Sequence, residues 1–153
     1  MAIIRQKKYA SNIIIITSIL SISYAIIRYH IMGGVPWKDF PFFILNKGIS
    51  LTAFILLTLN FGLGPLKNLG VNVPEGWLNS RQALGITGFL LVFVHLLMSF
   101  LLFKPEILGG FFEQNGTLTL IGGLSMLGGI LGFITLWVYN ISFQTFLKED
   151  KNF

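Results

Sequence analysis

The run RQALGITGFLLVFVHLLMSFLLFK, residues 81–104, decides the fold, because 22 uncharged residues separate Arg81 from Lys104. A helix needs about 20 apolar residues to cross the hydrocarbon core of a bilayer. Lipid offers no hydrogen-bond partner to an open backbone, so an apolar segment of this length is stable there as a helix. We therefore predict a transmembrane helix over residues 80–104.

Three other windows of the chain lack charged residues in the same way. They contain 19, 19 and 34 uncharged residues and predict helices over about 9–32, 48–66 and 117–147. The last window is too long for one span, so its membrane part is expected near 117–137. The predicted fold class is all-α: a polytopic membrane helix bundle of four transmembrane helices, forming a single domain over 1–153.

The composition excludes several classes of protein. Of the 153 residues 54% are hydrophobic and 11% are charged, whereas a soluble domain carries about 25% charged residues. The chain has no Cys, which excludes disulfides and thiolate-bound zinc or iron–sulfur clusters. The net charge of +5 comes from basic residues between the apolar runs rather than in a patch. The basic residues therefore indicate membrane flanks, and we expect a lipid bilayer and no nucleic acid as a partner.

The distribution of Lys and Arg predicts the orientation. With the N-terminus inside, the inner segments hold seven basic residues and the outer segments hold four. Short cytoplasmic loops carry the excess of Lys and Arg. We therefore expect a multi-pass protein of the cell membrane with both termini in the cytoplasm and with residues 33–47 and 104–116 outside.

His95 is the most informative residue for function. It follows Arg81 by 14 residues, which is ~21 Å along a helix. A polar ring at that depth is costly and marks a functional site by default. Gly85, Gly88, Val92 and Ser99 lie on the same helix face at spacings of three or four, so most of this face is small or polar.

Three interpretations of this face compete. The glycines can allow close helix packing while His95 hydrogen-bonds a neighbouring helix. Alternatively, His95 is an axial haem ligand, and Gly85 and Gly88 leave room for the macrocycle. The third interpretation is that His95 belongs to a proton relay. The lack of acidic residues in all four windows disfavours it. His30 lies at the outer end of the first predicted helix, roughly 10 Å or more from the level of His95, and is interpreted as an interfacial residue.

Other small and polar residues in the predicted spans are interpreted structurally. Small residues recur at spacings of four in the fourth window, as Ser125 with Gly129 and Gly128 with Gly132, a pattern that lets helices approach closely in lipid. We expect Gly128 and Gly132 to face another helix. Asn46, Asn60 and Asn140 are placed at or near helix ends, where they would be hydrated or would cap a helix.

The third predicted helix resembles a known family. Arg81-Gln82-Ala83-Leu84-Gly85-Ile86, followed by His95, is similar to the signature of the ferric reductase-like transmembrane domain. That family includes the haem-binding membrane subunit of the bacterial methionine sulfoxide reductase system and, more distantly, ferric reductases and NADPH oxidases. Gly64-Pro65-Leu66-Lys67 resembles its Pro-Leu-basic ending of the second helix. The resemblance covers roughly residues 10–147.

The resemblance implies haem b-dependent transmembrane electron transfer, a possible oxidoreductase component. His95 would be one axial ligand of the iron, and Gly85 and Gly88 would give the macrocycle clearance. An electron-donor protein or a quinone would supply electrons. The family has six core helices with the partner His on the fifth, so a second ligand is expected from a homo-oligomer, a partner subunit or further chain. The rival interpretation is a non-catalytic packing or assembly subunit with a structural His95.

The orientation can be tested by labelling of introduced cysteines in intact cells. A cysteine replacing Lys38 should react with a membrane-impermeant maleimide, because the loop over 33–47 is predicted to lie outside. A cysteine replacing Gly70 should be protected until the membrane is opened. The reverse pattern of labelling would place both termini outside the cytoplasm.

Overall fold

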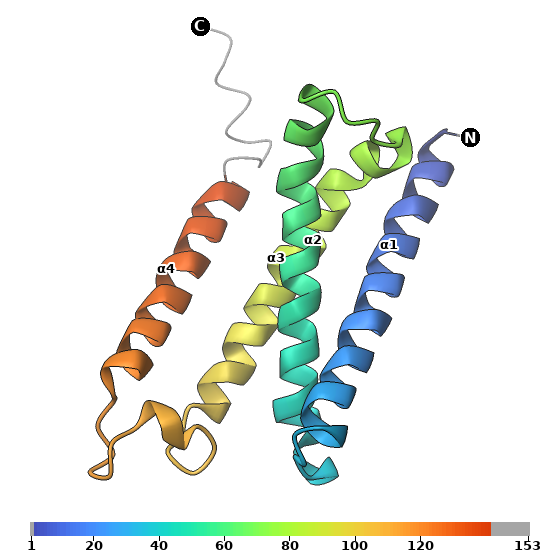
Figure 1. Ribbon diagram of the computed structural model, residues 1–153. Coiled ribbons are helices and arrows are strands. Elements are labelled where there is room, and N and C mark those ends of the chain that lie inside the picture. Colours follow the sequence, from blue (N-terminus) through green and yellow to red (C-terminus); the bar gives the residue numbers. More distant parts are fainter. Residues whose placement is uncertain (1, 142–153) are drawn as a thin grey trace, which may run out of the picture. The chain divides into compact units, whose positions relative to one another are not determined.

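The computed structural model describes residues 2–141 as a helical protein without a β-strand (Figure 1). Its four α-helices are α1 Ala2–Ala25, α2 Leu45–Asn68, α3 Glu75–Leu102 and α4 Leu120–Ile141. Each of the four overlaps a segment long and apolar enough to cross a membrane: Tyr9–Ile31, Trp37–Asn68, Glu75–Leu102 and Leu120–Tyr139. The predicted all-α class with four candidate transmembrane helices is confirmed.

The second helix extends beyond both of its predicted ends. A π-helical turn, η3 Phe40–Ile44, leads directly into α2, which begins at Leu45 rather than at residue 48. The first helix is prolonged in a similar way by the π-helical turn η1 Ile26–Ile31, close to the predicted end at residue 32. The early start of α2 places Asn46 inside a helix.

The predicted end of the second helix at residue 66 is two residues too early. Pro65 lies inside α2, and the helix continues for three further residues to Asn68. A proline removes one backbone donor, but the next turn closes with hydrogen bonds from Val71 N to Leu66 O at 3.1 Å and from Gly70 N to Lys67 O at 3.0 Å. With Gly70 at φ +85°, this is a Schellman motif. Gly70, rather than Pro65, therefore ends the helix.

Local capping also moves the starts of the last two helices. The carbonyl of Pro74 accepts hydrogen bonds from the amides of Trp77 and Leu78, so α3 begins at Glu75, earlier than the predicted residue 80. Thr119 Oγ1 accepts a hydrogen bond from Gly122 N at 3.0 Å and caps α4, which begins after the predicted residue 117. The part of the predicted fourth helix beyond residue 141 lies outside the described residues.

Contacts divide the chain into two compact units at the bond between His95 and Leu96. In the first unit α1 and α2 pack side by side (Figure 1). Small residues bring the two backbones together, since a Cβ on Gly48 would lie 3.1 Å from the Cα of Ile22. Close backbone approach through small residues is typical of helix pairs in membranes.

The second unit contains the loop before α4. The ring of Phe103 contacts the rings of Phe111 and Phe112, at centroid distances of 6.2 and 5.2 Å. The amide of Thr119 donates to Phe111 O at 3.0 Å, which ties the loop to the start of α4. Within this unit no atom lies within 4 Å of a Cβ on Gly128 or Gly132, so their packing against another helix stays a prediction.

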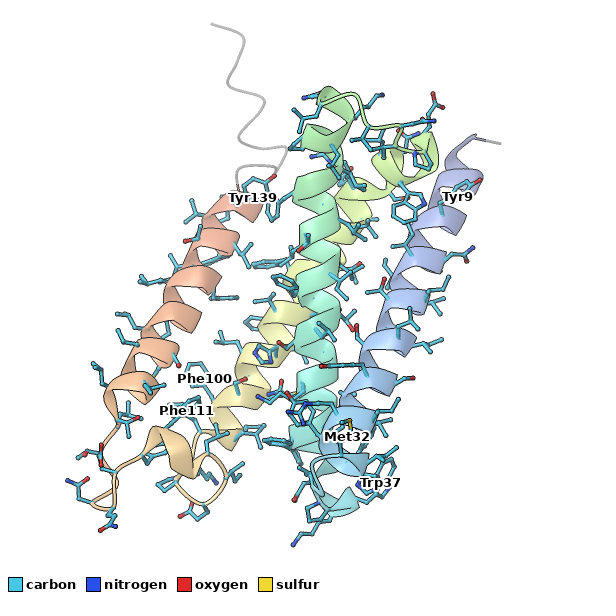
Figure 2. The ribbon with its side chains drawn as sticks, in the orientation of Figure 1. Tyr9, Met32, Trp37, Phe100, Phe111 and Tyr139 are labelled. Carbon is cyan, nitrogen blue, oxygen red and sulfur yellow. The ribbon has the colours of Figure 1, made fainter. Side chains whose placement is uncertain are left out.

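Aromatic residues mark both ends of the first unit. Figure 2 shows Tyr9 at one end of α1 and Trp37 beyond the other. The Tyr9 ring packs against Gly76, 3.0 Å from its Cβ position, whereas Trp37 is 56% exposed. Tyr and Trp gather at the two membrane–water interfaces. The 23-residue segment Tyr9–Ile31, roughly 35 Å as a helix, is therefore long enough to span the hydrocarbon core.

The packing of α1 on α2 predicts opposite effects for two glycines. Gly48→Ala should lower the free energy of unfolding by roughly 1–3 kcal/mol, because the new methyl group would lie only 3.0 Å from Cγ1 and 3.1 Å from Cα of Ile22. Gly62→Ala should be neutral or stabilising by up to about 1 kcal/mol, because its Cβ position is open and alanine favours a helix. Thermal unfolding in one detergent measures both. Equal effects at the two sites would contradict the close approach of α1 and α2.

Candidate functional site: the polar pair between α2 and α3

His95 lies in α3 and forms a hydrogen bond to Asn46 in α2. The distance from its ring Nδ1 to Asn46 Oδ1 is 2.7 Å. His95 is half-buried, and Asn46 is 3% exposed. The two residues lie 49 positions apart in the sequence, so the helix pair creates the site.

The bond determines which nitrogen of His95 carries the hydrogen. The Oδ1 of Asn46 is an amide oxygen and can only accept, so the Nδ1 of a neutral ring must donate. The lone pair then belongs to Nε2, the other ring nitrogen. His95 is therefore held in the form that binds a metal through Nε2.

Asn46 is a site residue that was predicted to be hydrated or to cap a helix. It is instead buried within α2, because the turn Phe40–Ile44 starts helical structure before it. A periodic signal does exist in the sequence. Asn46 and Asn60 are separated by two steps of seven residues, and so are Arg81 and His95. A step of seven returns to nearly the same face of a helix.

Gly85 and Gly88 form the close contact between α2 and α3. A Cβ on Gly85 would lie 2.9 Å from Asn60 Cγ, and one on Gly88 would lie 2.9 Å from Leu57 Cγ. Side chains of α2 therefore fill the space beside both glycines. The structure gives Gly85 and Gly88 a packing role, and the clearance predicted for a haem macrocycle is not open beside them while α2 is in place.

The outer histidine makes its contacts within its own loop. His30 Nδ1 lies 2.8 Å from Val35 O, and its ring contacts the ring of Trp37 at a centroid distance of 4.9 Å. Since Trp37 marks an end of the first unit, this position fits the predicted interfacial role. Among residues 2–141 no cluster of three His, Asp or Glu side chains is arranged to hold a metal ion.

Comparisons of the chain with protein-family models, curated proteins and solved structures found no match. The fold and the site still define a class: a polytopic helical membrane protein in which a partly buried Asn–His pair joins two candidate transmembrane helices. The resemblance of residues 81–86 and His95 to the ferric reductase-like domain stays a prediction.

The polar pair can be tested by a double-mutant cycle. Asn46→Ala and His95→Ala should each destabilise the protein, and their coupling free energy should be near the average of about 0.6 kcal/mol for hydrogen bonds between membrane helices and no more than about 1.7 kcal/mol. The measurement is reversible unfolding of the two single variants and the double variant in mixed micelles.

The matched control is a second cycle between Asn46 and Arg81. Arg81 bonds a different part of α2, so its coupling to Asn46 should be near zero. Additive effects of Asn46→Ala and His95→Ala would show that the bond does not contribute to the fold.

Proposed function

We propose that this chain is a membrane subunit for electron transfer that binds haem b through Nε2 of His95. One observation carries the proposal: the hydrogen bond from Nδ1 to Asn46 Oδ1 at 2.7 Å. Metal-bound histidines nearly always donate their other N–H to a carboxylate, a carbonyl or water, which fixes the ring and raises its basicity. Asn46 offers His95 such a carbonyl oxygen.

The proposed roles of the residues follow from this pair. His95 binds the iron, and Asn46 fixes the tautomer and the rotation of the ring. When bound, a haem supplies reversible one-electron exchange within the bilayer. Because α2 covers Gly85 and Gly88, these glycines would not line a haem held by His95.

Two components of the proposed system come from outside the described residues. The first is the second axial ligand, because His30 already contacts Val35 and Trp37 in its own loop. A second copy of the chain or a partner subunit would supply it. The other is the source of electrons, a donor protein or a quinone. The cell membrane, with both termini in the cytoplasm, is part of the same proposal.

The alternative is a non-catalytic packing or assembly subunit. The close fit of Gly85 and Gly88 against α2 favours it, since the same Asn46–His95 bond then serves only to join the helices. The two functions differ in the role of Nε2. A haem protein needs its lone pair, whereas a packing subunit needs only Nδ1–H.

Haem binding distinguishes these functions. Protein purified with haem supplied during expression should show a Soret band that His95→Ala removes, because the axial nitrogen is lost. His30→Ala should leave the spectrum intact. The monomeric chain should give a five-coordinate, high-spin spectrum, because a second His ligand is not among the described contacts of His95. Visible absorption and resonance Raman spectra measure all three.

A second variant, Asn46→Asp, tests the role of Asn46 in haem binding. Asn46→Asp preserves the acceptor for Nδ1–H, so haem should be retained with a lowered reduction potential, because a carboxylate increases the basicity of the ring. Full haem retention in His95→Ala would favour the packing subunit. A low-spin bis-histidine spectrum from the monomer would make His30 a ligand.

A further inference from the structure

The guanidinium of Arg81 occupies a space on α2 that a glycine leaves open. Its Nε donates to the backbone carbonyl of Asn60 at 2.9 Å. A Cβ on Gly64 would lie 2.8 Å from Nη1 and 3.2 Å from Nη2 of Arg81. The absence of a side chain at Gly64 therefore allows the guanidinium to lie against the helix.

Most of the donors of this guanidinium are not used within the described residues. An arginine has five N–H groups, and the bond from Nε to Asn60 O is the polar contact that Arg81 makes among described side chains and backbone. The Nη1 and Nη2 groups, four of the five donors, are left for an acceptor from outside the described residues. The complementary acceptor is an anion with two adjacent oxygens.

The depth of Arg81 indicates where that anion comes from. Arg81 lies six residues from the start of α3 at Glu75, about 9 Å along the helix. Gly64 lies four residues from the end of α2 at Asn68, about 6 Å along that helix. Both positions lie near one end of a candidate membrane span, and phospholipid headgroups flank the ends of such spans.

We propose that Arg81 binds the phosphate of a phospholipid headgroup through Nη1 and Nη2. A phosphodiester has paired oxygens that match the guanidinium fork. Lys67, in the last turn of α2, adds positive charge at the same edge, so an anionic lipid should bind more tightly than a zwitterionic one. Gly64 is required because a larger residue would displace the guanidinium. This site does not depend on whether His95 binds haem.

Lipid binding can be measured by native mass spectrometry of the whole chain released from detergent. Phosphatidylglycerol is titrated against phosphatidylcholine, and inorganic phosphate is added as a competitor. The wild-type chain should prefer phosphatidylglycerol. Arg81→Gln should weaken that binding roughly tenfold, because a charge-assisted bidentate contact is lost. The affinity of Arg81→Lys should lie between those of the wild type and Arg81→Gln, since an ammonium keeps the charge but cannot form the paired contact.

Two matched controls make the result specific to the site. Lys104→Gln removes a charge just beyond the other end of α3 and should leave the binding of phosphatidylglycerol unchanged. Gly64→Ala should weaken binding because it displaces the guanidinium, whereas Gly62→Ala, with open space at its Cβ position, should not.

Several outcomes would overturn the proposal. Unchanged binding of phosphatidylglycerol to Arg81→Gln would show that Arg81 does not bind lipid. If Arg81→Gln lowered the thermal stability without changing the lipid affinity, the role of Arg81 would be structural, through its bond to Asn60. Competition by millimolar inorganic phosphate as effective as that by lipid would make this a site for small anions. None of these measurements uses haem spectra, so their outcome is independent of whether His95 binds haem.

Discussion

In the hydrocarbon region of a bilayer a polar side chain has no water to bond with, and in this fold Nδ1 of His95 and Oδ1 of Asn46 satisfy each other. That bond also sets the register of α2 against α3. Seven residues before His95, Gly88 packs against the Ala53 carbonyl, and a further seven before, Arg81 bonds the Asn60 carbonyl. Seven residues back along α3 therefore correspond to seven residues forward along α2. A slip by one residue would break all three contacts.

The fold could be predicted from the sequence to a large extent because lipid leaves few choices. Long uncharged windows such as residues 82–103 cannot be stable in a bilayer except with all backbone groups paired, and this identified the four helices. Helix ends were harder, because they depend on single contacts. The sequence predicts an end of the second helix at residue 66, but the helix continues past Pro65 to Asn68, and Gly70 forms the cap.

The candidate site could be predicted only in part. His95 stood out because a lone imidazole in an apolar run is costly wherever it lies. Asn46 did not, because its importance comes from a helix 49 residues away. The roles of Gly85 and Gly88 likewise depend on Asn60 and Leu57, which only the packed structure brings to them. One face of α3 thus contains both the residues that hold α2 in place and the ring whose second nitrogen remains available.

The state of that ring is the central claim, and nitrogen-15 NMR of protein labelled at histidine tests it most directly. In detergent without haem, two-bond couplings to the ring hydrogens identify the nitrogens of His95, and His95→Gln assigns the signals. We predict a protonated, pyrrole-type Nδ1 and an unprotonated, pyridine-type Nε2, with Asn46→Leu abolishing this preference. A protonated Nε2 with a bare Nδ1 would contradict both the bond to Asn46 and the ligand role built on it.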